Sequence, residues 1–179
     1  MMKITTFKQI KKIYMHYFRL LIIFILLSQL TFAQDMKNFK LYNPYENVDS
    51  ALKIVLTQAK KENKHVFVQI GGNWCVWCAR FNDFVNKDQQ LDSAVNKNFI
   101  VYHMNYSPEN RNPEVLKKFG YPQRFGFPVF IMLDAKGNKL HTQNSAYLEE
   151  DKSYSKRKVL EFFDHWGPKA LDPEQYKKY

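Results

Sequence analysis

The two cysteines of the chain are the residues whose type and spacing point most directly to chemistry. Both stand in the segment Trp74-Cys75-Val76-Trp77-Cys78, which follows an apolar run and two glycines. We therefore predict that a strand ends at the glycines and that a helix opens at Cys75. The unpaired N–H groups and partial positive charge at a helix N-terminus favour a thiolate, which makes Cys75 the predicted nucleophile. Cys78 lies one turn further along the same face, where it can resolve a mixed disulfide on Cys75.

A pair of cysteines also has uses other than redox exchange. A disulfide that closes so short a loop recovers only about 2 kcal/mol of chain entropy. A chain long enough to build a full hydrophobic core gains little stability from it. Haem attachment requires His directly after Cys78, where the sequence has Ala79. We expect no metal, because the histidines downstream of the leader are widely spaced: His65, His103, His141 and His165. A structural staple and a metal site remain the less favoured alternatives.

The apolar pattern predicts the elements that position the cysteines. A helix over about 48–62, with Asn47 or Asp49 as its cap, is indicated by apolar residues at offsets of three and four. Strands are predicted at His65–Ile70, Phe99–Asn105 and Val129–Leu133. A hairpin turn at 134–138 leads from the last of them into a further strand at 139–141. Helices are predicted to begin at Cys75 and after Asp88, and to lie at 113–120 and at about 155–166. This order predicts an α/β fold with a mixed central sheet flanked by helices and an extra N-terminal helix.

The first 33 residues have the organisation of a secretory signal peptide. A basic stretch precedes the apolar run Leu20–Leu27, and small residues lead to Ala33, after which we expect cleavage. An uncleaved membrane anchor is the alternative. The stretch 20–33 contains Gln29 and is shorter than the roughly 20 apolar residues that a spanning helix needs. We therefore expect a periplasmic or secreted protein.

Removal of this leader changes the charge balance of the chain. The formal net charge of the full sequence is +10, and the leader carries five basic residues and no acidic one, so +5 remains. The surplus is scattered, which argues against a nucleic-acid partner. We expect a signal peptide over 1–33, an irregular lead-in over 34–46, and one monomeric domain over 47–179.

The Trp-Cys-x-x-Cys segment after the predicted strand 65–70, together with Phe127-Pro128 before the strand 129–133, resembles the thioredoxin superfamily. The most similar members are exported bacterial thioredoxin-like domains, and the resemblance covers roughly 48–170. It implies a thioredoxin-like fold, a cis Phe127–Pro128 bond packed against the cysteine pair, and exchange with protein thiols and disulfides without a bound cofactor. The alternative for Pro128 is an ordinary trans proline at the start of an edge strand.

The aromatic residues at the motif are candidates for substrate binding. Phe127 and Pro128 are expected to position the partner chain, and Trp74 and Trp77 to form an apolar docking surface. Trp74 has the alternative role of covering the disulfide. The segments 106–112 and 143–154 either shape partner choice or are solvated loops.

One position departs from the family pattern. Many members have a buried acid six residues before the first cysteine, where this sequence has Gln69. An amide cannot take the proton of the second thiol, so another acceptor is needed. His103, in the strand 99–105 near a position where the family often has Lys, is the candidate, because the ordinary pKa of histidine is near 6.5. A histidine without catalytic duty is the alternative.

These expectations lead to a thiol–disulfide oxidoreductase that acts on protein partners outside the cytoplasm. Reduction fed by a membrane-bound electron donor is favoured over oxidation or isomerisation by analogy with the family. The alternative is a non-catalytic thioredoxin-like module that binds peptides or a partner.

Overall fold

The computed structural model describes residues 9–23, 36 and 38–177 of the chain. Contacts divide the chain into two units, Met1–Phe39 and Lys40–Tyr179. In the first unit, residues 9–23 are helical. The remainder of the expected leader, with the expected cleavage site at Ala33, lies outside the described residues. Among the helices that the structure does describe, none has both the length and the apolar character needed to cross a membrane.

A four-stranded mixed sheet forms the centre of the second unit, in the order β2-β1-β3-β4. The strands are β1 His65–Gly71, β2 Phe99–Asn105, β3 Val129–Leu133 and β4 Lys139–Asn144. The pair β1–β2 is parallel, while β3 runs antiparallel to both β1 and β4. A parallel pair needs a long crossover, and the two helices between β1 and β2 supply it.

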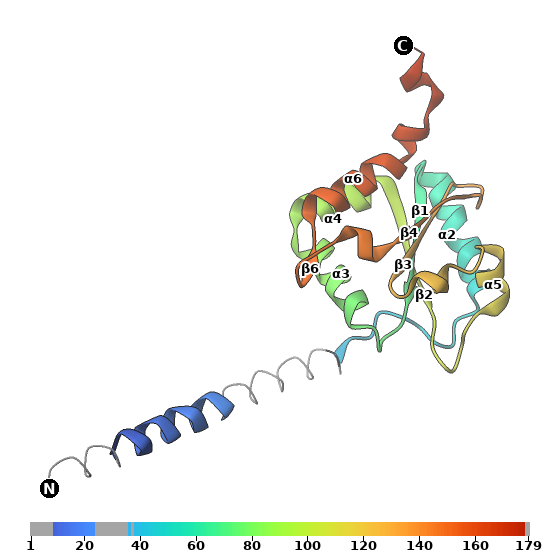
Figure 1. Ribbon diagram of the computed structural model, residues 1–179. Coiled ribbons are helices and arrows are strands. Elements are labelled where there is room, and N and C mark those ends of the chain that lie inside the picture. The colour runs from blue at the N-terminus through green and yellow to red at the C-terminus, as the bar shows by residue number, and fades with distance from the viewer. Residues whose placement is uncertain (1–8, 24–35, 37, 178–179) are drawn as a thin grey trace, which may run out of the picture. The chain divides into compact units, whose positions relative to one another are not determined.

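Helices cover both faces of this sheet (Figure 1). They are α2 Val48–Glu62, α3 Val76–Lys87, α4 Gln89–Asn98, α5 Pro113–Lys118 and α6 Lys156–Trp166. α3, α4 and α6 lie on one face, and α2 and α5 lie on the other. The predicted α/β fold with a mixed sheet, flanking helices and an extra N-terminal helix is confirmed.

Side-chain alternation along β1 fills two separate cores. Val66, Val68 and Ile70 belong to the cluster packed against α2 and α5. Phe67 points to the opposite face, where it contacts five other phenylalanine rings at centroid distances of 5.1–6.3 Å. Because successive side chains of a strand alternate between faces, Gln69 shares the α3 face with Phe67. The strand therefore delivers Gln69 beneath the helix that carries the cysteines.

The segment 143–154 is more ordered than a solvated loop, and that part of the sequence prediction is wrong. β4 extends to Asn144, and a 3-10 turn Ser145–Leu148 and the short strands β5 Glu149–Glu150 and β6 Ser153–Tyr154 follow it. Leu148 and Tyr154 are buried. Tyr154 packs against Phe81 of α3 at 5.0 Å between centroids, so burial of an aromatic side chain ties this polar segment to the fold. Further 3-10 turns, which the sequence pattern did not predict, lie at Pro122–Phe125, Pro168–Leu171 and Pro173–Tyr176.

Candidate active site

Cys75 and Cys78 form a disulfide at the start of α3, with 5.2 Å between their Cα atoms. Cys75 is the N-cap residue of this helix, and its Sγ accepts a hydrogen bond of 3.1 Å from the backbone N–H of Cys78. Both side chains are buried, Cys78 completely and Cys75 with 3% of its surface exposed. A sulfur at an N-cap faces the donors that stabilise negative charge. The predicted start of a helix at Cys75 is confirmed, and the role of Cys75 as nucleophile stays a prediction.

The turn between β1 and α3 brings Trp74 over the active site. Its indole Nε1–H donates a 2.8 Å hydrogen bond to the backbone carbonyl of Tyr106, which follows β2. A methyl group on Gly72 would lie 2.4 Å from Trp74 Nε1 and 2.9 Å from this carbonyl oxygen. Gly72 is thus required because any side chain there would push the indole away from its hydrogen-bond partner.

Phe127 lies beside Trp74 and directly precedes Pro128, whose expected packing against the cysteine pair stays a prediction. The Phe127–Pro128 bond is cis, which confirms the predicted isomer. The ring of Phe127 stacks on Tyr106 at 4.7 Å and meets Trp74 edge-on at 5.5 Å. Pro128 is buried and directly precedes Val129, which begins β3. Trp74 is 52% exposed, so part of this aromatic group is open to solvent next to Cys75.

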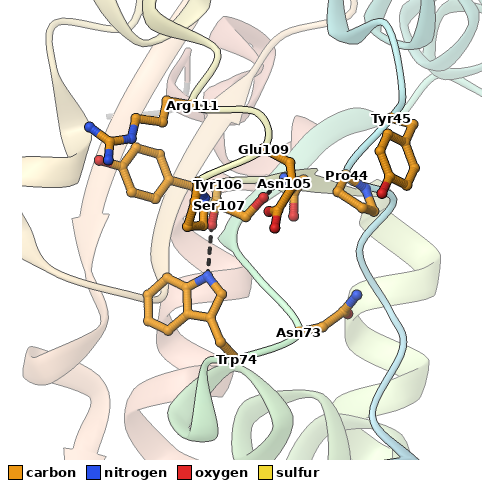
Figure 2. Close-up of a pocket in the computed structure, with 10 residues that line it drawn as sticks. Pro44, Tyr45, Asn73, Trp74, Asn105, Tyr106, Ser107, Glu109 and Arg111 are labelled. Atoms are coloured by element: carbon orange, nitrogen blue, oxygen red, sulfur yellow. Dashed lines mark hydrogen bonds between the residues drawn. The ribbon is translucent and has the colours of Figure 1, made fainter.

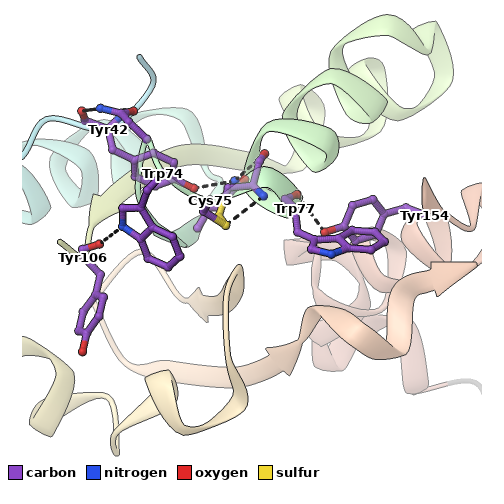
Figure 3. Close-up of a disulfide and its surroundings, with 9 residues drawn as sticks. Tyr42, Trp74, Cys75, Trp77, Tyr106 and Tyr154 are labelled. Atoms are coloured by element: carbon purple, nitrogen blue, oxygen red, sulfur yellow. Dashed lines mark hydrogen bonds between the residues drawn. A yellow bond between two sulfur atoms is a disulfide. The ribbon is translucent and has the colours of Figure 1, made fainter. Parts of the chain in front are cut away.

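Trp77 lies in a different environment from Trp74. Figure 3 shows the two indoles on either side of Cys75. Trp77 packs edge-on against Tyr154 at 5.6 Å, and its backbone carbonyl accepts a hydrogen bond from the Tyr154 hydroxyl at 3.1 Å. The guanidinium of Arg80 lies over its ring at 4.7 Å. Trp77 therefore ties β6 to α3, and its part in a docking surface with Trp74 stays a prediction.

Tyr42 is a residue of the site that the sequence analysis missed. It comes from the lead-in, yet its side chain is 3% exposed. Its hydroxyl accepts a 2.7 Å hydrogen bond from Nε2 of Gln69, which also lies 3.5 Å from the carbonyl oxygen of Cys78. Asn73 fixes the lead-in, because its Oδ1 accepts from the backbone N–H groups of Leu41 and Tyr42 and its Nδ2 donates to the Tyr42 carbonyl, all at 2.9 Å.

No local pattern marks Tyr42 in the sequence. Residues 40–46 contain neither helix nor strand, so no periodicity shows which side chain is buried. Burial raises the pKa of the Tyr42 hydroxyl far above its usual value, while the hydrogen bond from Gln69 opposes the rise. The phenol is consequently neutral at any physiological pH and keeps its proton.

His103 lies on the same side of the sheet as these groups. It pairs with Gln69 in the β1–β2 register, and its ring meets that of Tyr42 edge-on at 5.6 Å. Burial lowers the pKa of His103 to about 4. The imidazole is therefore neutral at pH 7 and a weaker base than an exposed histidine, and its role as proton acceptor stays a prediction. Across the described residues no group of three or more His, Cys, Asp and Glu side chains is arranged to hold a metal ion.

An open pocket of about 640 Å³ adjoins the exposed side of Trp74 (Figure 2). Pro44 and Tyr45 of the lead-in line one side of it, and the loop after β2, with Glu109 and Arg111, lines the other. The loop 106–112, which the sequence left open as a determinant of partner choice, thus borders a hollow next to the active site.

Comparison with known structures reveals similar folds. The disulphide isomerase from Xylella fastidiosa Temecula1 matches with a TM-score of 0.60 at 22% identity, over 69% of this chain and 94% of that one. The C-terminal domain of DsbD from Neisseria meningitidis in the oxidised form has a TM-score of 0.49 at 17% identity, over 68% and 97%. A thioredoxin from Thermus thermophilus has a TM-score of 0.45 at 17% identity, over 77% and 97%. No curated protein gives a significant match. At this level of identity the likeness to the Xylella structure shows the fold.

The sequence comparison identifies the family itself. A family model described as thioredoxin-like matches residues 45–135, which is more than half of the chain. The matched region contains α2, β1, both cysteines and the cis Phe127–Pro128 bond that leads into β3. The chain therefore belongs to the thioredoxin-like family.

Proposed function

We propose that this protein is a thiol–disulfide oxidoreductase whose Cys75–Cys78 pair exchanges with protein thiols and disulfides outside the cytoplasm. The observation that carries the proposal is the position of Cys75 at the N-cap of α3, where its sulfur accepts the N–H of Cys78. This hydrogen bond and the partial positive charge of the helix end both favour the thiolate. A disulfide that only stapled the fold would need neither.

The reaction proceeds by two exchanges. In the dithiol form, the Cys75 thiolate attacks a partner disulfide, forms a mixed disulfide and releases one partner thiolate. Cys78 then loses its proton and attacks Sγ of Cys75, which closes the Cys75–Cys78 bond and releases the second partner thiolate. Two electrons pass to the partner, and the proton given up by Cys78 ends on a released thiolate or on water. The reverse sequence oxidises a partner dithiol.

The aromatic residues around the pair would position the partner. Trp74 is exposed beside Cys75 and packs edge-on against the half-buried Phe127, and the cis Phe127–Pro128 bond leads into β3. Trp77 contributes on the opposite side of the disulfide, where its packing on Tyr154 limits its movement. Neither a bound cofactor nor nucleic acid takes part in this scheme, and the domain would work as a monomer.

We propose export through the leader 1–33, which places the protein in the periplasm or outside the cell. Its basic start, apolar run and small residues before Ala33 support this location. The fold similarity to a disulphide isomerase supports partners that carry disulfides. A membrane-bound electron donor would keep the pair reduced. The reduction potential of the Cys75–Cys78 pair, compared with that of the compartment, tests this direction.

The direct test is insulin reduction with dithiothreitol as the electron source. Wild type should accelerate reduction, Cys75→Ser should be inactive, and Cys78→Ser should accumulate a mixed disulfide on Cys75. Activity that survives Cys75→Ser excludes this residue as the nucleophile. If the wild type is inactive but still binds reduced or oxidised peptides, the non-catalytic binding module is the correct function.

A further inference from the structure

Near the resolving cysteine Cys78, the side chain of Tyr42 from the lead-in contacts those of Gln69 from β1 and His103 from β2. We propose that the Tyr42 hydroxyl donates a hydrogen bond to Cys78 Sγ as that sulfur becomes a thiolate, and so speeds the step in which Cys78 resolves the mixed disulfide. The inference rests on the proposed function and assigns the lead-in a part in the same site.

Cys78 Sγ and the Tyr42 hydroxyl oxygen both lie close to the Cα of Gly71. A methyl group on Gly71 would lie 2.4 Å from Cys78 Sγ and 2.9 Å from the Tyr42 hydroxyl oxygen. Both atoms therefore border one small space at the end of β1, which a glycine leaves open. Cys78 is completely buried, so water has little access to stabilise a charge on its sulfur, and a protein donor has correspondingly more influence.

The hydrogen bond from Gln69 orients the Tyr42 hydroxyl. Nε2 of Gln69 donates to the phenol oxygen at 2.7 Å, so the hydroxyl proton must point away from that amide. A phenol whose pKa is raised by burial does not take the proton of the thiol. It acts instead as a donor, and hydrogen bonds to an ionised partner are about twice as strong as neutral ones.

Tyr42 is held in place by the residue that precedes the active-site motif. Asn73 makes three hydrogen bonds to the backbone of Leu41 and Tyr42. The position of the phenol is therefore coupled to the turn that ends at Cys75. Figure 3 shows the Tyr42 side chain reaching toward the disulfide from the lead-in.

Two other ionisable groups that interact with Tyr42 are uncharged at neutral pH. His103, whose ring contacts Tyr42, has its pKa lowered to about 4 by burial. Tyr154, which interacts electrostatically with Tyr42, has its pKa raised by burial. Cys75 is bonded to the partner sulfur in the mixed disulfide. His103 and Tyr154 therefore place no charge near Cys78 that would outweigh the dipole of the Tyr42 hydroxyl.

The experiment uses 5,5′-dithiobis(2-nitrobenzoate) as the partner disulfide and follows the coloured thiolate by stopped flow. Attack by Cys75 releases the first thiolate, and resolution by Cys78 releases the second. In wild type two equivalents should appear in two phases, whereas Cys78→Ser should release one. Absence of a first phase in wild type contradicts the proposed function itself, separately from the role of Tyr42.

Tyr42→Phe should slow the second phase about threefold to fourfold and leave the first phase unchanged. Loss of one charge-assisted hydrogen bond reduces the thiolate fraction of Cys78 about tenfold at pH 7. The remaining thiolate is about threefold more nucleophilic because its basicity rises, which offsets part of the loss. An unchanged second phase in this variant overturns the inference.

Tyr102→Phe is the matched control. Tyr102 also holds the lead-in, through a 2.8 Å hydrogen bond from its hydroxyl to Glu46, but it belongs to the core on the other face of the sheet. The control should leave both phases unchanged, and an equal slowing in both variants would mean that loosening of the lead-in is the cause. A fluorinated tyrosine at position 42 keeps the ring and strengthens the donor, so it should accelerate the second phase. A failure to accelerate it also contradicts the inference, whether or not Tyr42→Phe folds.

Discussion

A methyl group at the end of β1 would act on the disulfide directly. Gly71 is the last residue of this strand, and a Cβ there would lie 2.4 Å from Cys78 Sγ and 2.9 Å from the hydroxyl oxygen of Tyr42. Non-bonded heavy atoms normally stay about 3.5–4.0 Å apart, so the sulfur must retreat by more than about 1 Å. In the oxidised protein it is bonded to Cys75 and has little freedom to do so. We predict that Gly71→Ala destabilises the oxidised form selectively.

The magnitude follows from the cost of overpacking. An extra carbon in a packed core costs about 1–3 kcal/mol, and the lower chain entropy of Ala than Gly in the unfolded state recovers about 0.4–1 kcal/mol. We expect the oxidised protein to lose about 1–2 kcal/mol, or about 2–8 °C in Tm. In the reduced protein Cys78 can rotate, and only the contact with Tyr42 remains. A difference of about 1.4 kcal/mol between the two forms makes the reduction potential about 30 mV less negative.

Thermal unfolding of both redox forms and equilibration with a thiol–disulfide buffer measure these effects. Gly167→Ala is the control, because its methyl group would meet the Asn98 side chain at 3.1 Å, far in sequence from the cysteines. It should change both redox forms equally. Combining Gly71→Ala with Cys78→Ala should recover most of the lost stability. Equal losses for Gly71→Ala in the oxidised and reduced forms would refute the proposed clash with the sulfur.

Three further predictions concern residues around the site. Burial lowers the pKa of His103 to about 4 from 6.5, so on acidification the unfolded state binds a proton before the folded state does. The free energy of unfolding should therefore fall by up to about 3 kcal/mol as pH drops from about 6.5 to 4. In urea unfolding, His103→Asn should flatten this pH dependence. Asn73→Ala removes three hydrogen bonds to the lead-in and should cost about 2 kcal/mol in the same measurement. Trp74→Phe removes the hydrogen bond to Tyr106 and should slow insulin reduction about threefold. The first phase of the stopped-flow reaction with 5,5′-dithiobis(2-nitrobenzoate) should stay unchanged.

Elements with a local signature were predictable from the sequence. The strands at 99–105 and 129–133 have the predicted bounds, and the helix 48–62 is capped by Asn47, which accepts the N–H of Ser50. The apolar period lies within each element, and the cap of the helix directly precedes it in the sequence. The helix predicted after Asp88 is α4, and Asp88 caps it by accepting from the N–H groups of Gln90 and Leu91. Local chemistry therefore determines the framework that presents the cysteines.

The parts of the site that escaped prediction depend on contacts across the fold. Tyr42 reaches its place through Asn73, about thirty positions later in the chain. Tyr154 is buried because Trp77 and Phe81 lie on α3 above it. Neither position has a periodic pattern around it, so a polar, irregular stretch in the sequence gives no indication that one of its aromatic side chains becomes part of the core.

The substitution of an amide for the buried acid changes the kind of electrostatics that acts on Cys78. A carboxylate at position 69 would place a titrating charge beneath the sulfur, and its effect would vary with pH. Gln69 instead carries no charge and orients the Tyr42 hydroxyl, and His103 beside them is neutral at pH 7. The two sulfurs thus face dipoles: the proposed donor to Cys78 is the phenol of Tyr42, and Cys75 faces the N–H of Cys78 and the start of α3. Buried dipoles are fixed in place and little screened by salt. The rate of exchange at this site should therefore change little with ionic strength and should respond more to substitutions that displace the lead-in.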